Sequence, residues 1–174
     1  MTIADCHITV IHTGLAHDAD MRQFLLECLN IREQVFCEEQ HIEFGIEQDG
    51  KDNESGHILL WYQNIPVGTM RYRQTDEGIR LERLSVLSPY RGLQYGKLLI
   101  QAGIRAARDE HLEGQIYLHA QVSALPFYQK LGFIDFGDEF NEGGIAHRNM
   151  FLPKETENEL VSAADKACFS EQAG

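Results

Sequence analysis

The most constraining feature of the sequence is residues 79–111, where a strand pattern passes directly into a long helical pattern. Residues 79–87, "IRLERLSVL", are rich in the apolar residues typical of a strand. Pro89 and Gly92 then end the strand, and apolar residues recur at helical spacing over 93–111. Unpaired backbone N–H groups and the helix dipole attract phosphate to such a helix start. The turn therefore predicts a phosphate site, although proline and glycine also serve simply to end a strand and cap a helix.

This turn lies in a locally basic part of an acidic chain. The 27 Asp and Glu residues outnumber the 15 Lys and Arg residues, which gives a net charge of −12. The acidic balance argues against nucleic acid and against an anionic membrane as partners. A small anion remains compatible, because one central stretch gathers cationic residues that only a few acidic ones oppose. These cationic residues are Arg71, Arg73, Arg80, Arg83, Arg91, Lys97, Arg105 and Arg108.

Length and composition predict one folded domain. A chain of 174 residues with 43% hydrophobic and 24% charged residues matches an average globular protein with a single core. No apolar run approaches the roughly 20 residues that span a bilayer, and the N-terminus lacks the pattern of a signal peptide. We therefore expect a cytoplasmic protein.

Neither the cysteines nor the histidines predict a metal site. The four cysteines, Cys6, Cys28, Cys37 and Cys168, form no CxxC pair, so we expect reduced and mostly buried thiols. The five-residue spacing from His7 to His17 does not bring their side chains to one face of a strand. No metal is expected.

Periodicity predicts an alternation of strands and helices. Residues 44–55 are expected to form a loop, and residues 154–174 either an amphipathic helix or a frayed tail. The other elements are a strand at 7–12, a helix at 17–36, a hairpin of strands 56–63 and 67–74, a strand at 79–87, a helix at 93–111, a strand at 114–121, a short helix at 122–132, and a strand pair at 133–140 and 145–152.

Two separate segments resemble one family in the right order. The segment from Arg91 to Gly96, "RGLQYG", is similar to the pyrophosphate loop of the GNAT superfamily of acyl-CoA-dependent N-acyltransferases. Residues 124–133, "ALPFYQKLGF", resemble a later motif of the same family. The resemblance covers residues 5–152 and is closest to small bacterial predicted acetyltransferases, a subgroup that generally lacks an assigned substrate.

The resemblance implies a fold and a division of the chain. The expected fold is a three-layer α+β fold, in which helices flank a mixed, mostly antiparallel sheet of six to seven strands. The sheet is expected to splay between its fourth and fifth strands. Residues 1–153 would form a single GNAT domain, with 154–174 as a tail or short helix.

The resemblance also implies how acetyl-CoA binds. Backbone amides from Leu93 to Lys97 and the Arg91 side chain would hold the diphosphate, while the strand before the loop pairs with the pantetheine arm. Gln94 departs from the family, which usually has glycine there. The implied coenzyme residues are Leu84, Val86, Arg91, Gly92, Leu93, Gln94, Tyr95, Gly96, Lys97 and Phe127.

Catalysis in this family proceeds by direct attack of an amine on the thioester. Tyr128 matches the general acid that protonates the departing thiolate, and the Val86 N–H matches the oxyanion donor. Glu82 and His147 are candidate general bases. The alternatives are that Glu82 forms a salt bridge with a neighbouring arginine and that His147 is a structural histidine. Cys37 has no evident histidine partner, so we expect a buried thiol there. Substrate contacts are expected from Arg32, Arg71, Arg83 and Gln121.

The leading hypothesis is a GNAT N-acetyltransferase that acts on a primary amine of a small molecule or a protein. The acidic run at 38–54 would suit a cationic acceptor, but such a run is more often a solvated loop. One alternative is a non-catalytic acyl-CoA sensor. Another is an acyltransferase similar to acyl-homoserine-lactone synthases, which the pattern of Arg32, Phe36 and the acidic residues at 47–52 resembles. Monomer and homodimer both stay open.

Overall fold

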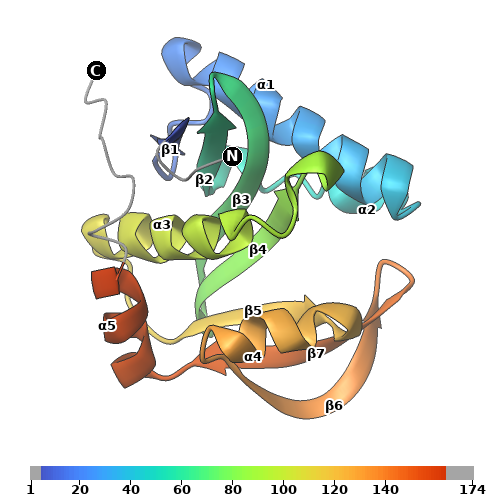
Figure 1. The fold of residues 1–174 in the computed structure, drawn as a ribbon, viewed down its shortest axis with the longest axis vertical. Coiled ribbons are helices and arrows are strands. Elements are labelled where there is room, and N and C mark those ends of the chain that lie inside the picture. Colours follow the sequence, from blue (N-terminus) through green and yellow to red (C-terminus); the bar gives the residue numbers. More distant parts are fainter. Residues whose placement is uncertain (1–4, 164–174) are drawn as a thin grey trace.

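The computed structural model describes residues 5–163 and contains one seven-stranded sheet (Figure 1). The strand order is β1-β2-β3-β4-β5-β7-β6, and every neighbouring pair is antiparallel except β4 and β5, which are parallel. This confirms the expected mixed, mostly antiparallel sheet. The strands are β1 Cys6–Ile11, β2 Gly56–Tyr62, β3 Ile65–Thr75, β4 Gly78–Val86, β5 Ile116–Gln121, β6 Ile134–Glu142 and β7 Ile145–Leu152.

Helices flank this sheet on both faces. Because side chains alternate along a strand, Leu59 of β2 packs with residues of α1, whereas Ile58 and Leu60 pack with residues of α3 on the other face. The helix α5 lies against α3, where the Gln101 side chain donates a hydrogen bond to the Leu160 carbonyl over 2.9 Å. The helices are α1 Ala19–Arg32, α2 Phe44–Glu47, α3 Tyr95–Asp109, α4 Leu125–Lys130 and α5 Lys154–Ser162.

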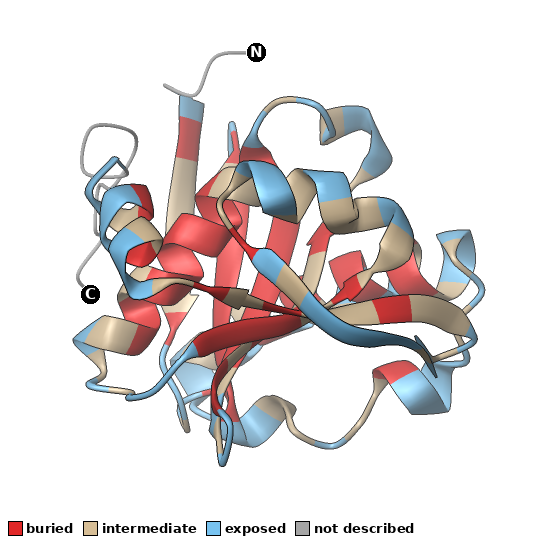
Figure 2. Cartoon of the chain, turned by 90° about the horizontal axis from the view of Figure 1, so that it is seen from below, coloured by how far each residue is buried: buried red, intermediate tan, exposed pale blue. Residues whose placement is uncertain are grey.

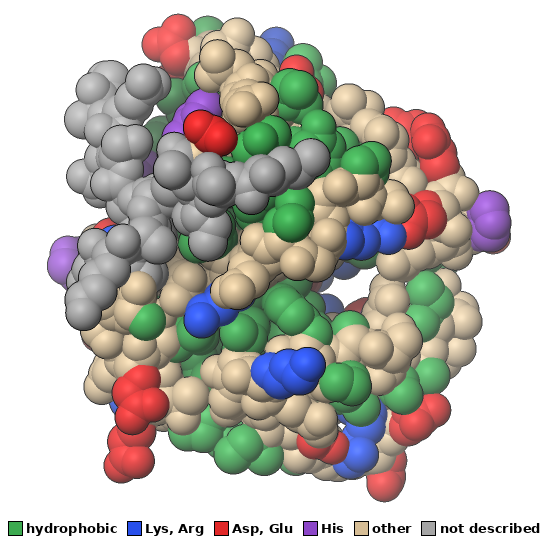
Figure 3. Space-filling model, viewed as in Figure 1, with side chains coloured by type: hydrophobic (Ala, Val, Ile, Leu, Met, Phe, Trp, Pro, Cys, Tyr) green, Lys and Arg blue, Asp and Glu red, His purple; other side chains and the backbone are tan. Residues whose placement is uncertain are grey.

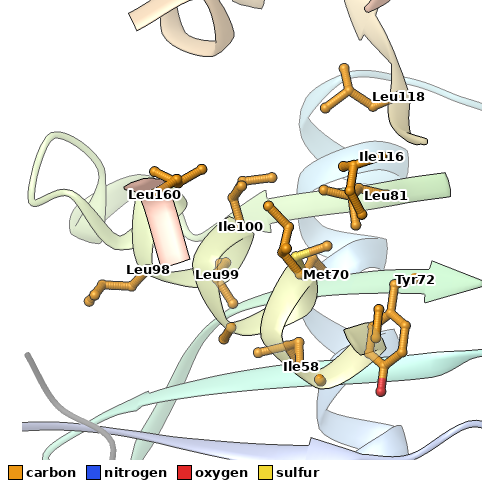
Figure 4. Close-up of a cluster of buried hydrophobic side chains, with 14 of the residues drawn as sticks. Ile58, Met70, Tyr72, Leu81, Leu98, Leu99, Ile100, Ile116, Leu118 and Leu160 are labelled. Carbon is orange, nitrogen blue, oxygen red and sulfur yellow. The ribbon is translucent and has the colours of Figure 1, made fainter. Parts of the chain in front are cut away.

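The larger hydrophobic core lies between α3 and the central strands (Figure 4). Met70, Leu81 and Leu99 are at most 2% exposed there. Gly103 allows the close approach of helix and sheet, because a Cβ at that position would lie 2.6 Å from the Met70 sulfur. Figure 2 shows the buried residues gathered in the central strands and the helix that packs on them.

The sheet opens between β4 and β5, as expected from the sequence. These strands pair only at Ile79 with Ile116 and at Arg80 with Tyr117, and beyond these positions they diverge (Figure 1). Arg83 has a left-handed backbone with φ of 56°, next to an irregularity in the β3–β4 register. Such a bulge bends its strand. The second half of β4 therefore has a free edge that faces the opening.

Most predicted elements are confirmed, with two departures near the sheet opening. The helix predicted over 17–36 is α-helical from Ala19 to Arg32 and continues as a π-helical segment over Glu33–Glu39. The loop predicted over 44–55 contains α2 and a 3₁₀ turn at Asp52–Glu54. In the predicted tail, α5 is a helix that buries Leu160, while residues 164–174 lie outside the described part of the chain, as does Cys168. Within residues 5–163, no helix is long and apolar enough to cross a membrane.

Candidate active site

A cavity of about 1150 Å³ occupies the opening between β4 and β5. Two of its walls are formed by the π-helical segment with the residues that follow it as far as Lys51, and by the second half of β4 with the start of α3. The remaining walls come from β5, α4 and the turn between β6 and β7. Figure 3 shows this face hollowed between its two halves, with Lys and Arg side chains beside the hollow. The cavity thus brings together segments that are far apart in the sequence.

The start of α3 forms one wall of the cavity, and its backbone has the conformation that the loop sequence suggests. Gly92 and Gln94 both have positive φ, 76° and 65° respectively, and Gln94 is the N-cap of α3. The first N–H groups of a helix have no intrahelical acceptor, so they remain available to an anion. A Cβ on Gly96 would lie 3.0 Å from the Phe127 ring. Glycine at position 96 therefore lets the start of α3 approach α4 closely.

Most residues of the predicted loop line the cavity. The exception is Leu93, which packs at the edge of the main core instead. The loop residues in the cavity wall are Arg91, Gly92, Gln94, Tyr95, Gly96 and Lys97.

Arg91 has a partner that the sequence did not predict. Its Nη1 and Nη2 lie 2.5 and 2.9 Å from the two carboxylate oxygens of Glu39, at the end of the π-helical segment. Its Nε donates to the Val86 carbonyl over 2.8 Å. The hydrogen bond from Arg91 lowers the pKa of the Glu39 carboxyl. The Arg91 guanidinium is thus held at the mouth of the cavity by Glu39 and the Val86 carbonyl.

The free edge of β4 lies beside this loop. Leu84 and Val86 both line the cavity. The Leu87 N–H donates to the Val67 carbonyl of β3 over 2.9 Å. Because N–H groups alternate in direction along a strand, the Val86 N–H points away from β3 and toward the opening. An extended chain could therefore hydrogen-bond to this edge.

Tyr128 of α4 lines the opposite wall. Its ring meets Phe127 and Phe133 edge to face, with centroid distances of 5.0 and 5.8 Å. Its hydroxyl makes no hydrogen bond with any other described residue. Burial raises the pKa of Tyr128, so the phenol is protonated at neutral pH and able to donate a proton.

Glu82, a predicted base, is a poor proton acceptor in this structure. One of its oxygens accepts hydrogen bonds from Arg71 and Arg73, and the Arg80 Nε lies 3.1 Å from the other. Burial opposes ionisation of Glu82, but the charges of Arg71 and Arg80 and the hydrogen bond from Arg73 prevail and lower its pKa. The carboxylate is therefore ionised and bound on both oxygens.

His147, the other predicted base, lines the cavity beside Glu142. Its Nδ1 lies 2.8 Å from the Ile145 carbonyl, which can only accept, so Nδ1 carries the proton. Its Nε2 is 3.8 Å from the Glu142 carboxylate. The ring stacks on Phe140 with centroids 5.9 Å apart. In this tautomer Nε2 is the acceptor nitrogen.

The four residues predicted to bind substrate fall into two groups. Arg32 and Arg71 are 1% and 0% exposed and do not line the cavity. Arg32 pairs with Glu47 and Asp52, and Arg71 pairs with Asp49, Asp52 and Glu82. Their role in binding substrate stays a prediction.

Arg83 and Gln121 do line the cavity. The Gln121 side chain donates to the Gln40 side chain over 2.8 Å, which joins β5 to the loop after the π-helical segment. Arg83 contacts carbonyls and carboxylates at the end of α2 and just after it, over residues 46–49. Arg73 and Arg80 of the cationic stretch also line the cavity, as do Glu39 and Gln40 of the run at 38–54. Three further polar residues of the wall had been assigned no role: Lys51, His119 and Glu142. Among residues 5–163, no three His, Cys, Asp or Glu side chains gather in a group able to hold a metal ion.

Comparison with known proteins shows the family. The sequence profile of the family described as "Acetyltransferase (GNAT) domain" matches residues 20–153. The chain belongs to this family. As a GNAT acetyltransferase it is an acyltransferase enzyme, which confirms the family and the fold expected from the sequence.

Several relatives and structures are similar to this GNAT chain. The Bacillus subtilis protein YyaT is 40% identical over 126 residues, which are 71% of this chain and 84% of YyaT. The Bacillus subtilis protein named "Uncharacterized N-acetyltransferase YjcF" is 38% identical over 127 residues, or 72% of this chain and 90% of YjcF. The crystal structure of Escherichia coli ElaA has a TM-score of 0.72 and 25% identity, and the match covers 85% of this chain and 99% of ElaA.

The structure of a lactone synthase shares the fold. The CoA-dependent acyl-homoserine lactone synthase BjaI, crystallised with SAM and isopentyl-CoA, has a TM-score of 0.69. The match covers 92% of this chain and 90% of BjaI at 17% identity. This likeness shows a common fold and nothing about the substrate.

Proposed function

We propose that the protein is an N-acetyltransferase that transfers the acetyl group of acetyl-CoA to a primary amine by direct attack within a ternary complex. The observation that carries this proposal is that three separate features line one cavity. The start of α3, the free edge of β4 and the Tyr128 phenol all face the same space. These are the groups needed to hold a diphosphate, an extended amide chain and a thioester sulfur.

Acetyl-CoA would bind as the donor substrate along this wall. The amides at the start of α3 and the Lys97 ammonium would contact the diphosphate, with Arg91 released from Glu39 to join them. The pantetheine amides would pair with β4 near Leu84 and Val86. This pairing needs an unpaired strand edge, which the divergence of β4 and β5 supplies.

The reaction requires a neutral amine. An ordinary alkylamine with a pKa near 10.4 is neutral about once in a few thousand molecules at pH 7. The guanidinium groups of Arg73, Arg80 and Arg83 in the cavity wall would lower this pKa, because a nearby cation disfavours the charged amine. His147 Nε2 would then accept the proton as the new C–N bond forms. We prefer His147 to Glu82 as the base because arginines bind both oxygens of Glu82.

Collapse of the tetrahedral intermediate breaks the C–S bond. The Val86 N–H would stabilise the oxyanion before this step. Tyr128 would donate its proton to the departing thiolate, and the proton removed from the amine would finally restore the phenol. The products are an amide and free CoA.

A thiol-release assay tests this proposal. Purified protein, acetyl-CoA and a panel of primary amines should release CoA faster than hydrolysis alone. Arg91→Ala should weaken acetyl-CoA binding and leave the rate at saturation largely intact, whereas Arg22→Ala, on the exposed side of α1, should change neither. If CoA binds but no amine raises thiol release, a non-catalytic sensor is the better account. If S-adenosylmethionine and an acyl donor give a lactone, the synthase account replaces the amine acetyltransferase.

A further inference from the structure

The end of the cavity away from the α3 loop is rich in arginine. Arg73 of β3, Arg80 of β4 and Arg83 at the β4 bulge all line it, and we call these three the cavity arginines. Arg73 and Arg80 converge on the single carboxylate of Glu82, which Arg71 also contacts. Arg80 also lies 3.3 Å from the Glu142 carboxylate, which is 40% exposed. Three guanidinium groups therefore share Glu82, and like charges at such close range repel one another.

Charge accounting over the whole cluster gives the same result. The arginines at 32, 71, 73, 80 and 83 and the Lys51 ammonium stand against five carboxylates, at 47, 49, 52, 82 and 142. Lys51 makes no ion pair with any other described residue. The carboxylate at 142, at the end of β6, is 40% exposed and is therefore well screened by solvent. This end of the cavity is thus cationic in a chain whose net charge is −12.

The acidic loop does not reverse this charge. The sequence left open a cationic acceptor held by carboxylates at 38–54. In the structure, Glu47 contacts Arg32 and Arg83, and Asp49 contacts Arg71 and Arg83. Carboxylates that already bind guanidinium groups offer little attraction to a second cation.

The cavity arginines also have unused hydrogen-bond donors. Within the described part of the chain, the Arg73 Nη1 and Nη2 groups make no hydrogen bond; only its Nε does, to Glu82. The Nε atoms of Arg80 and Arg83 are buried and make no hydrogen bond of good geometry, although they lie 3.1 and 3.4 Å from carboxylate oxygens of Glu82 and Glu47. Burial lowers the pKa of Arg83, and the neighbouring Arg71 charge lowers it further. The Arg73 side chain is only 14% exposed, and unpaired Nη donors at so sheltered a position favour an acceptor that a ligand supplies.

We propose that the acceptor substrate is a primary amine that also carries a carboxylate, and that the free edge of the Arg73 guanidinium binds this carboxylate, with Arg80 and Arg83 beside it. A planar carboxylate fits the paired donors of a guanidinium. The same positive charge would favour the neutral form of the amine, so one cluster serves both binding and reactivity. This inference rests on the proposed acetyltransferase function, and it names the substrate class.

Matched amine pairs test the inference. Each pair has the same carbon skeleton with and without the carboxylate, for example phenylalanine with 2-phenylethylamine and 4-aminobutyrate with butylamine. We expect kcat/KM to be at least tenfold higher for the carboxylate member of the preferred pair. In Arg73→Gln this ratio should fall toward one. Arg73→Lys should give an intermediate ratio, because lysine keeps the positive charge but lacks the paired N–H donors of the guanidinium. Arg22→Gln, which removes an exposed arginine of α1, should keep the wild-type ratio.

A binding measurement separates failure of this inference from failure of the proposed function. Calorimetry would titrate N-acetylphenylalanine, N-acetyl-4-aminobutyrate and their carboxamides into the CoA-saturated protein. Binding of a carboxylate that Arg73→Gln abolishes supports the subsite even if no amine is acetylated, and the transferase proposal alone would then fail. Equal kcat/KM within every pair, or equal binding of acid and carboxamide, would overturn the inference and leave the acetyltransferase proposal standing.

Discussion

Replacing Arg71 with methionine should reduce stability more than any other single loss of charge near the cavity. Arg71 is fully buried, and its guanidinium reaches Asp49 over 2.6 and 2.8 Å, Asp52 over 2.9 Å and Glu82 over 2.9 and 3.1 Å. Removing one partner of a buried ion pair typically costs about 3–5 kcal/mol, because the other charge stays buried and uncompensated.

The structure places Arg71→Met at the lower end of that range. Each of its three carboxylates keeps another arginine, namely Arg83, Arg32 and Arg73. We therefore expect a loss of about 3 kcal/mol at pH 7, which for a chain of this size lowers Tm by roughly 6–12 °C. Arg22→Met should change Tm by less than about 2 °C, because surface substitutions rarely exceed about 0.5 kcal/mol.

The loss should depend on pH. Burial opposes ionisation of Asp49, but hydrogen bonds and charge from Arg71 prevail and lower its pKa; the pKa of Glu82 is also lowered. A carboxyl whose folded pKa is lowered stabilises the protein above its unfolded pKa, near 4, and loses that contribution as pH falls. The gap between wild type and Arg71→Met should therefore be full at pH 7 and narrow below about pH 4.

Urea unfolding followed by circular dichroism from pH 7 to pH 3 measures this gap. A loss below about 1 kcal/mol at pH 7, or a gap that stays constant across the range, would refute the ion-pair reasoning. A stable Arg71→Met protein with a raised KM for the amine would instead support the sequence-based prediction that Arg71 binds substrate.

Three further changes probe the donor half of the cavity. Tyr128→Phe should lower turnover at least about tenfold with little change in CoA affinity, as loss of a general acid does; an unchanged turnover number would remove the phenol from the mechanism. Glu39→Gln should tighten CoA binding about two- to fivefold at low salt, because it frees Arg91 from a surface pair worth up to about 1 kcal/mol; weaker binding by calorimetry would contradict this competition. Gln94→Gly should raise the free energy of unfolding by about 0.5–1 kcal/mol. The left-handed conformation costs glutamine about 1–2 kcal/mol, and glycine avoids this cost. Part of the gain is lost because glycine gives the unfolded chain more conformational entropy. Gln94→Ala should be neutral in the same denaturant titration, and equal stability of all three proteins would argue against strain at this position.

The order of strands and helices was predictable because each element has a local signal. Alternating or continuous apolar runs marked the strands, and Pro89 and Gly92 marked the turn into α3. The π-helical segment after Arg32 was not predictable, because its residues continue the same helical pattern and the changed hydrogen bonding leaves no separate mark in one sequence. The short α2 in the expected loop has only four residues, too few for a periodic pattern.

The site was predictable where it depends on local motifs and unpredictable where it depends on tertiary register. The loop at 91–97 and the motif around Tyr128 predicted residues that the structure places in one cavity, and their role in binding acetyl-CoA stays a prediction. The pairing of Arg91 with Glu39 joins residues 52 positions apart, and the sequence around either residue contains no signal that predicts it. Likewise, Arg71 and Glu82 become partners only through the register of β3 on β4, so the sequence could not distinguish a buried ion pair from a substrate contact.

The central claim is that coenzyme A lies between the start of α3 and the free edge of β4. A crystal structure of the protein with CoA tests it most directly. We expect the diphosphate against the backbone amides at 93–97 and the sulfur within about 4 Å of the Tyr128 hydroxyl, close enough for proton transfer with little adjustment. A coenzyme bound elsewhere, or a cavity without coenzyme in crystals grown at saturating CoA, would contradict the account.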